Sequence, residues 1–442
     1  MAINYKNDTP INYDIVSRII EDSGLKDLSR ATIREIVGLV NKISAASGVK
    51  FIRMEMGVPG LKPSNIGINA EIEALKNGVA SDYPMLDGVQ ILKDETSKFV
   101  KMFMDVEVKP ESCIPTVGSM QGGYASFMLV GAIDKKKDTC LFLDPGFPVQ
   151  KQQMSIIGNK YESFDVYNYR GEKLKEKLES YLSSGSINSI IYSNPNNPSW
   201  ICFTEEELQI IGELATKYDV IVIEDLAYFA MDFRKDLSKP GQAPFQATVA
   251  KYTNNYILMI SSSKAFSYAG QRVGMVVFSD ALYHRKYDGL KDRFNTEELG
   301  YTFVQRLLYA LSSGTSHSAQ YALAAMLKSA NEGTYNFVEE VREYGERAHK
   351  AKKLFTDNGF EIVYDKDINE PIADGFYFTI AYPGISSGEL LNDLMYYGIG
   401  AIALITCGSN SSSGLRACVS QIKNDQFSDL EFRLKKFKEH HS

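Results

Sequence analysis

The sequence predicts an α/β protein: a large domain with a mostly parallel seven-stranded sheet covered by helices, and a smaller α+β domain. Short continuous apolar runs, such as 220–223 and 256–260, alternate with helical segments, as in parallel sheets that are buried on both faces. Beyond about residue 310 the order changes to long helices followed by strands, which is typical of an α+β domain. A chain of 442 residues is also too long for a single hydrophobic core.

Composition argues against several classes of function. The formal net charge of −7 at pH 7 does not favour a nucleic-acid-binding face. The five cysteines form no CxxC pair, which fits a reducing compartment, and the five histidines form no HExxH pattern, which argues against a zinc site. Residues 1–10 are polar, and no apolar run approaches the roughly 20 residues that span a bilayer. We therefore expect a cytoplasmic protein with no nucleic-acid or membrane partner.

The N-terminal segment predicts an arm of two helices, at 13–21 and 29–46, with Ser29 as the N-cap of the second. The glycines and prolines of 54–63 then mark an extended loop that links this arm to the main domain. We expect the large domain to span residues 61–315 and the small domain to comprise 1–60 and 316–442.

The large domain alternates strands and helices in order. Its strands are expected at 113–118, 139–143, 160–164, 189–192, 220–223, 256–260 and 271–278. Its helices are expected at 89–104, from about 119 to 133, after 148, at 171–182 and from 205, where Thr204 and Glu207 form a capping box. Ligands bind at the carboxyl ends of strands in such sheets. Five polar clusters converge on this edge, following Val117, Leu143, Tyr192, Ile223 and Ile260.

The small domain combines long helices with short strands. Its helices are expected at 317–330, 335–358, 387–397 and 426–440, and its strands at 361–364, 375–381, 401–406 and 415–420.

The strand at 256–260 leads directly into a group of reactive and phosphate-binding side chains. Ser261, Ser263 and Lys264 follow it, and Arg272 comes eight positions after the lysine. Hydroxyls and a guanidinium beside an amine form a phosphate pocket that contains a reactive amine, which is the chemistry needed to hold pyridoxal phosphate. A second strand-to-helix junction, at Ser119, is suited to binding an anion at a helix N-terminus. Taken singly, the serines are also explained as a turn and the lysine as a solvated surface residue.

The set of motifs resembles the class I/II aminotransferases, the fold-type-I family of pyridoxal-phosphate enzymes, from about Tyr83 to Arg416. The resemblance implies that Lys264 binds pyridoxal 5′-phosphate as a Schiff base. It also implies a set of phosphate-binding residues: Ser119, Met120, Gln121, Ser261, Ser263 and Arg272.

The resemblance further assigns residues to the cofactor ring. Asp225 would pair with the pyridine nitrogen, and Asn197 and Tyr228 would bond the ring oxygen. Phe147, in Pro-Gly-Phe-Pro, would stack on the ring. The alternatives are structural, with Asp225 as a helix N-cap and the two aromatic residues as core packing.

Two residues are implied to act outside the ring. Tyr83 would reach the phosphate of a neighbouring subunit, which implies a homodimer with active sites at the interface; the alternative is a turn tyrosine. Arg416 would clamp the substrate α-carboxylate. One departure from the family is Trp200, which stands where a glycine is usual and is expected to pack under its loop.

We therefore expect an aminotransferase that moves an amino group from an amino acid to a 2-oxo acid. No second arginine is assignable to a substrate side-chain carboxylate, so dicarboxylate specificity is not supported. Similar residues also serve a C–S β-lyase or other elimination and decarboxylation enzymes, which is the alternative. A cofactor-sensing regulator is disfavoured because the chain is acidic and shows no added DNA-binding domain.

Overall fold

The computed structural model describes residues 8–441, so most of the polar segment 1–10 lies outside the described residues. The chain forms two compact units. The larger unit comprises 61–196 and 202–341, and the smaller comprises the described residues up to Gly60, together with 197–201 and 342–441. The helix α13 (His317–Asn331) packs in the larger unit against α3 (Asn65–Lys76) and α4 (Gln90–Met104). The compact units therefore divide the chain differently from the predicted domain boundary at 315/316.

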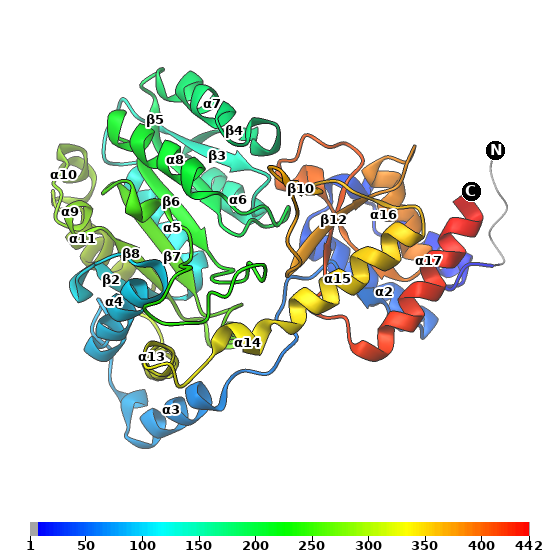
Figure 1. The fold of residues 1–442 in the computed structure, drawn as a ribbon, viewed down its shortest axis with the longest axis horizontal. Helices are drawn as coiled ribbons and strands as arrows, with labels where there is room; N and C mark the ends of the chain where they lie inside the picture. The colour runs from blue at the N-terminus through cyan, green and yellow to red at the C-terminus, as the bar shows by residue number, and fades with distance from the viewer. Residues whose placement is uncertain (1–7, 442) are drawn as a thin grey trace. The chain divides into compact units, whose positions relative to one another are not determined.

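The larger unit is built on a seven-stranded sheet in the order β2-β8-β7-β6-β5-β3-β4 (Figure 1). Every neighbouring pair is parallel except the two that involve β8, which runs antiparallel to both β7 and β2. This confirms the predicted mostly parallel sheet. The strands are β2 (Cys113–Thr116), β3 (Thr139–Asp144), β4 (Lys160–Asp165), β5 (Ile187–Ser193), β6 (Ile221–Leu226), β7 (Tyr256–Ser261) and β8 (Gly274–Phe278).

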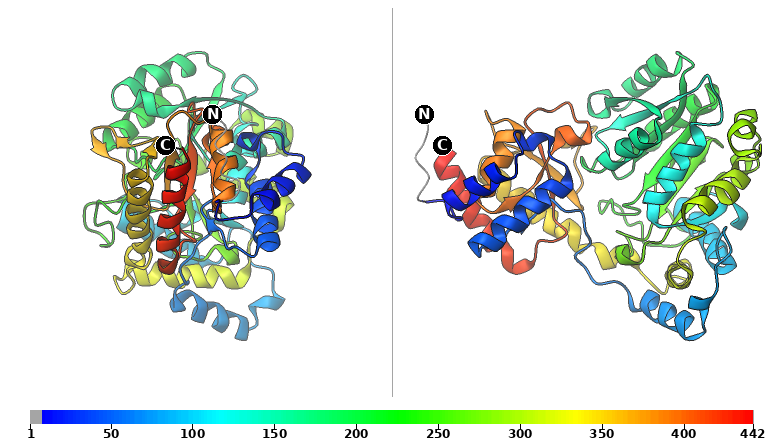
Figure 2. Two further views of the ribbon diagram at one scale, coloured as in Figure 1. Left: turned by 90° about the vertical axis from the view of Figure 1, so that its right-hand side faces the viewer. Right: turned by 180° about the vertical axis from the view of Figure 1, so that it is seen from behind.

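Helices cover both faces of this sheet because the strands are apolar on both sides. Ile223 and Met259 belong to a core that also contains residues of α5 (Gly118–Val130) and α6 (Pro148–Ile157). Alternate strand residues face the other side. There, α7 (Lys173–Leu182) and α8 (Glu205–Lys217) pack on each other, and Figures 1 and 2 show them across the sheet from α5. The Thr204–Glu207 capping box at the start of α8 is present as predicted.

Several helices of the larger unit were not predicted from the sequence. One is α3, and the others form a run of short helices after β8 that packs on the same face as α5. These are α9 (Asp280–Tyr283), α10 (Asp288–Phe294), α11 (Leu299–Thr302), a π-helical turn (Phe303–Leu308) and α12 (Tyr309–Ser312). Short helices of four to seven residues span too few turns to show a clear apolar period.

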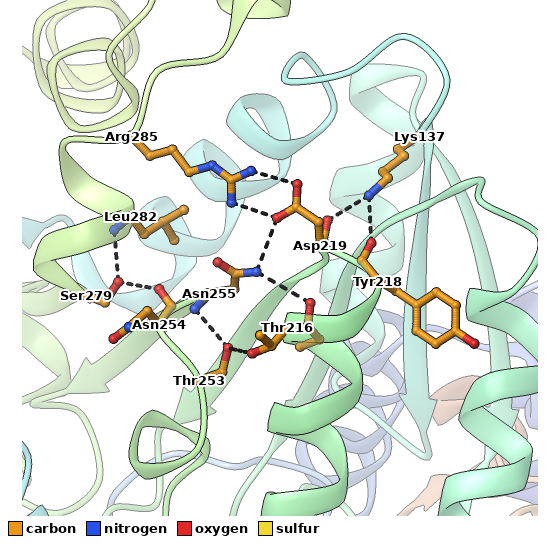
Figure 3. A network of polar contacts seen from close by, with 11 residues as sticks. Lys137, Thr216, Tyr218, Asp219, Thr253, Asn254, Asn255, Ser279, Leu282 and Arg285 are labelled. Carbon is orange, nitrogen blue, oxygen red and sulfur yellow. Dashed lines mark hydrogen bonds and ion pairs between the residues drawn. The ribbon is translucent and has the colours of Figure 1, made fainter.

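A network of polar contacts lies at the end of the large sheet where its parallel strands begin (Figure 3). Asp219, in the turn before β6, accepts two hydrogen bonds of 2.7 Å from the Arg285 guanidinium, which lowers the pKa of that carboxyl. The Lys137 ammonium donates to the carbonyl oxygens of Tyr218 and Asp219 at 2.8 Å. These contacts fix the loops that enter the strands, whereas the loops that leave the strands carry the candidate site.

The smaller unit has a four-stranded antiparallel sheet in the order β14-β15-β12-β9. Its strands are β9 (Glu361–Ile362), β12 (Tyr377–Ala381), β14 (Ile402–Ala403) and β15 (Leu415–Cys418). Separate pairs join β1 (Ile52–Arg53) to β13 (Ile399–Gly400) and β10 (Lys366–Asp367) to β11 (Glu370–Pro371).

The helices of the smaller unit are α1 (Tyr13–Asp22), α2 (Ile33–Ser47), α15 (Glu343–Asp357), α16 (Ser387–Tyr396) and α17 (Phe427–His441). In Figure 2, α17 (red) lies beside α15, and the two helices are in contact. Buried Arg433 of α17 donates to the carbonyl oxygens of Tyr397, Gly398 and Lys50. One guanidinium thus ties α17 to the segments before β13 and β1.

Three predicted boundaries in and beside the smaller unit are wrong. The N-cap of α2 is Thr32, not Ser29, because Thr32 forms a capping box with Glu35. The predicted helix 335–358 is broken at Arg342 into α14 (Phe337–Val341) and α15. The predicted strand 401–406 is only β14, followed by a 3-10 turn at Leu404–Cys407. Among residues 8–441, no helix is both long and apolar enough to cross a membrane.

Candidate active site

The register of the large sheet brings a serine and a helix N-terminus to the same edge. Ser261, the last residue of β7, is paired with Gly274 at the start of β8, and Gly274 is paired with Thr116 at the end of β2. The helix α5 begins two residues later, at Gly118. A Cβ on Gly274 would lie 3.3 Å from the backbone nitrogen of Ser119, so the first turn of α5 rests against β8.

Arg272 completes this group. Its backbone has φ 54, and Nη1 of its guanidinium donates to the carbonyl oxygen of Ala269 at 2.8 Å. A Cβ on Gly118 would lie 2.6 Å from Nη2, so the guanidinium lies against the first residue of α5. The Ser261 hydroxyl oxygen accepts from the Ser263 backbone N–H at 3.1 Å. We call the first turn of α5 with Ser261, Ser263 and Arg272 the cationic cradle.

Two predicted residues of α5 have other partners within the chain. The Gln121 side chain accepts from the Val117 N–H at 2.8 Å and donates to the Ser312 hydroxyl at 2.7 Å. Its amide therefore caps the helix and ties it to α12. Met120 is partly exposed, and its carbonyl oxygen accepts from the Gln153 amide at 3.0 Å. A phosphate-binding role for either residue stays a prediction.

Asp225 is a buried carboxyl near the end of β6. Its Oδ2 accepts from the Gln150 amide at 3.0 Å, and its Oδ1 accepts from the Ala227 backbone N–H at 3.1 Å. Burial raises the pKa of Asp225 to about 6, and these two hydrogen bonds oppose the shift. Within residues 8–441, both groups that donate to this carboxylate are neutral.

The helix α6 connects these two groups. Phe147 is its N-cap residue and is half-buried, and its stacking on the cofactor ring stays a prediction. Gln150 holds Asp225, while Gln153, one turn further on, holds the carbonyl of Met120 in α5. Sequence reasoning missed both glutamines. The only available signal was their i, i+3 spacing, which places them on one face of the helix.

The other predicted residues of the larger unit differ in exposure. Lys264 is partly buried, and its carbonyl oxygen accepts from the Ser267 N–H at 3.2 Å, which closes the turn after β7. Tyr228 is buried in the loop after β6. Tyr83 is 89% exposed, so it does not contribute to the core of this unit.

A second buried carboxyl, not predicted from the sequence, stands at the end of β3. Asp144 forms an ion pair with Lys151 of α6. Burial raises the pKa of Asp144 to about 6, although the Lys151 ammonium opposes the shift. The contact ties the start of α6 to the sheet, so α6 is held by β3 as well as by Asp225.

The smaller unit carries Asn197, Trp200 and Arg416. The Arg416 side chain is 1% exposed, and its Nη2 donates to the carbonyl oxygen of Glu55 at 2.6 Å. Its guanidinium lies 4.8 Å from the ring centroid of Tyr377. Burial raises the pKa of the Glu55 carboxyl, which is paired with Arg53 and also experiences the charge of Arg416.

Comparison with known proteins identifies the family of this chain. Residues 50–373 match the sequence profile of the family described as aminotransferase class I and II. The chain belongs to the class I and II aminotransferase family. It is therefore a transaminase, an enzyme that moves an amino group from an amino acid to a 2-oxo acid.

Curated members of the family show the extent of the similarity. A probable aspartate aminotransferase of Methanocaldococcus jannaschii is 23% identical over 402 residues, which cover 89% of this chain and 93% of that protein. An LL-diaminopimelate aminotransferase of Natranaerobius thermophilus is 28% identical over 239 residues, which cover 52% of this chain and 58% of that protein.

Solved aminotransferase structures share the fold. The alanine aminotransferase of Pyrococcus furiosus has a TM-score of 0.75 at 18% identity, with 94% of this chain and 98% of that chain covered. The aspartate aminotransferase of Thermus thermophilus with maleate has a TM-score of 0.73 at 16% identity, with 96% and 98% covered. These likenesses confirm the predicted fold-type-I architecture.

Proposed function

We propose that this aminotransferase uses pyridoxal 5′-phosphate, bound at the carboxyl edge of the large sheet. The observation that carries the proposal is the place of the Arg272 guanidinium against Gly118, at the first turn of α5. A permanent cation, the N–H groups of a helix N-terminus and two serine hydroxyls are the donors that a phosphate dianion needs. The cationic cradle therefore fits the phosphate of the cofactor.

Asp225 fits the ring nitrogen. Its pKa is raised to about 6 because it is buried, and a protonated ring nitrogen would supply the cation that its neutral partners do not. The carboxylate would in turn keep the proton on that nitrogen. The cofactor, when bound, supplies an electron sink for the charge that develops at the substrate Cα. Gln150 would orient the carboxylate through its hydrogen bond.

Lys264 is assigned the covalent link to the cofactor and the proton transfer at the substrate Cα. Lys264 lies in the turn after β7, close in sequence to Ser261 and Ser263, and an amine is the nucleophile that such a covalent link needs. Phe147 is assigned to the ring face, and Tyr228 and Asn197 to the ring oxygen. Their support is the order of the motifs along the chain and the burial of Tyr228.

The substrates are an amino acid and a 2-oxo acid, and Arg416 is assigned to the carboxylate that both carry. Its guanidinium is buried, so water competes weakly for the ion pair. The relatives are named for aspartate and LL-diaminopimelate, and solved neighbours are named for alanine and aspartate. These names span an acidic side chain, a small one and a long one that carries both an amino group and a carboxylate, and they leave the amino donor of this enzyme to experiment.

An isologous homodimer is part of the proposal. Tyr83, Met85 and Tyr309 are 89%, 71% and 60% exposed. A Cβ on Gly314 would lie 3.4 Å from the Pro84 ring and 3.9 Å from the Met85 carbonyl oxygen, and Ser312, at the end of α12, accepts from Gln121 of α5. This apolar surface next to the cationic cradle supports an interface in which Tyr83 reaches the phosphate of the partner subunit.

A reducing, cytoplasmic location is also proposed. All five cysteines are free, and four of them are buried. Burial raises the pKa of the Cys140 thiol to about 12, so this thiol is unreactive.

The test is spectroscopic. Purified protein supplied with pyridoxal phosphate should be yellow, an amino donor should bleach the colour, and a 2-oxo acid should restore it. A panel of amino donors scored by bleaching identifies the substrate. A protein that does not take up the cofactor would refute the proposal. Release of pyruvate and ammonia from a cysteine-type substrate, without an oxo-acid acceptor, would instead indicate the β-lyase.

A further inference from the structure

Trp200, the only tryptophan, is an integral part of the smaller unit. Residues 197–201 belong to that unit, although the chain on both sides belongs to the larger one. The residue is fully buried and has φ 66, a conformation that costs a bulky residue about 1 kcal/mol or more. A Cβ on Gly375 would lie 2.0 Å from the indole Cε2, so the indole occupies the space that a side chain there would need. Trp200 therefore packs against Gly375.

The side chains of Trp200, Tyr377 and Arg416 contact one another in this order, and we call these three residues the Trp200 column. The rings of Trp200 and Tyr377 meet edge to face, with centroids 6.2 Å apart and planes at 65°. The face of Tyr377 supports the Arg416 guanidinium at 4.8 Å. The two strands explain this contact: Thr379 of β12 is paired with Arg416 of β15, which makes Tyr377 a diagonal neighbour on the same face.

Each member of the column is confined from the other side. A Cβ on Gly57 would lie 1.9 Å from the Tyr377 hydroxyl, so this glycine leaves room for the phenol. The Glu55 carbonyl accepts from Nη2 of Arg416 at 2.6 Å. The hydrogen bond to Glu55 and the face of Tyr377 therefore both contact the guanidinium, and Trp200 contacts that ring at its other neighbour position.

We propose that Trp200 and Tyr377 are positioning residues for the substrate carboxylate. Bidentate binding of a carboxylate depends on the plane of the guanidinium, and the Tyr377 face sets that plane. Trp200 fixes the ring and, at the same time, anchors the segment that begins at Asn197. The inference rests on the proposed role of Arg416 as the carboxylate clamp. It adds that residues 200 and 377 control affinity for both substrates, because both carry this carboxylate.

Kinetics of the holoenzyme separate positioning from packing. Tyr377→Leu removes the face under Arg416, and Trp200→Phe keeps a smaller ring against Tyr377. We expect KM for amino donor and oxo acid to rise about 10- to 30-fold in Tyr377→Leu, and by less in Trp200→Phe, with a smaller change in kcat. In Trp200→Gly, glycine relieves the positive φ but removes the indole, so KM should still rise.

The matched control is Phe360→Leu, a buried ring of the same unit that contacts Phe355 and Phe437 instead of the column. It should lower Tm and leave KM unchanged. If Trp200→Phe and Tyr377→Leu behave like Phe360→Leu, the column only fills space and the inference is wrong.

Trp200 also provides a readout that is independent of turnover. Because the chain has one tryptophan, its emission reports on this column alone. Propionate, a carboxylate without an amino group, should change the emission of the wild-type holoenzyme to saturation. The midpoint should rise about 10- to 30-fold in Tyr377→Leu, where Trp200 is retained. Wild-type emission that stays constant while propionate inhibits competitively would refute the inference.

Arg416→Lys tests the proposed carboxylate-binding role of Arg416 separately from the positioning role of Tyr377 and Trp200. If KM does not rise in this variant, the proposed carboxylate role of Arg416 fails. If KM rises in Arg416→Lys but not in Tyr377→Leu and Trp200→Phe, the carboxylate role stands and only the column is refuted.

Discussion

Gly118 and Arg272 are complementary: a methyl group on the glycine would lie 2.6 Å from Nη2 of the arginine. Gly118 also has φ 66, which suits glycine at the first residue of α5. The glycine thus serves two purposes, because it turns the chain from β2 into the helix and lets the guanidinium approach the helix N-terminus.

Gly118→Ala should therefore weaken cofactor binding through the phosphate. The added methyl group displaces the guanidinium, and losing a hydrogen bond to a charged group costs about 1.5–3 kcal/mol, or roughly 10- to 100-fold in the Kd of pyridoxal phosphate. The Kd is measured by absorbance titration of the apoenzyme.

Gly185→Ala is the control for backbone strain. Gly185 has a similar φ of 74, and no atom lies within 4 Å of its Cβ position. It should lose about 1 kcal/mol of stability and keep the wild-type Kd. Equal Kd values in the two variants would show that Gly118 contributes only its conformation.

The large sheet could be predicted from the sequence because its buried strands are short apolar runs separated by helices. The end of the sheet that carries the candidate site could also be predicted, because a polar cluster follows each of these strands. The positions of Asp225 near the end of β6 and of Lys264 just after β7 were predictable from such clusters, whereas their roles at the cofactor stay predictions. Gln150 and Gln153 were not, since their function depends on how α6 packs against β6 and α5. The Trp200 column was also hidden, because strand pairing brings residues 377 and 416 together and a ring contact distant in sequence adds residue 200.

Lys264→Ala should abolish the covalent link and slow transamination by about 10²–10⁴-fold, since the amine that transfers the proton is gone. After borohydride reduction, mass spectrometry should find the cofactor attached to Lys264 of the wild type and absent from the variant. Lys135→Ala, at a side chain that is 81% exposed, is the control and should behave as wild type. A fully active Lys264→Ala enzyme would exclude every catalytic role proposed for this residue.

Tyr83→Phe should raise the Kd of pyridoxal phosphate about 10-fold in a protein that remains dimeric, because one hydroxyl donor to the phosphate is lost. Light scattering gives the oligomeric state. Tyr309→Phe changes another exposed ring, 60% accessible, and should leave the Kd unchanged. A monomeric wild-type enzyme with full activity would contradict the assignment of Tyr83 to the partner's site.

Asp225→Asn should stabilise the apoenzyme at high pH. Burial raises the pKa of Asp225 from 3.8 to about 6, so between these values the folded state binds more protons than the unfolded state. The stability that this carboxyl contributes therefore falls as pH rises, by up to about 3 kcal/mol, and stays lost above pH 6. In urea unfolding, the advantage of the variant should grow by about 1 kcal/mol between pH 5 and pH 8. With cofactor present the order should reverse, because only the carboxylate pairs with the ring nitrogen.

Gln150→Leu tests how that carboxylate is held. The Gln150 amide donates to the charged form of Asp225, so its removal should raise the pKa of the carboxyl further above 6. The pH-dependent loss of apoenzyme stability should then continue to higher pH than in the wild type. Gln153→Leu is the matched control, because Gln153 lies one turn away in α6 and donates to the Met120 carbonyl instead. Each variant loses one side-chain hydrogen bond, and only Gln150→Leu should change the shape of the pH profile. Identical profiles would mean that burial alone sets the titration of Asp225.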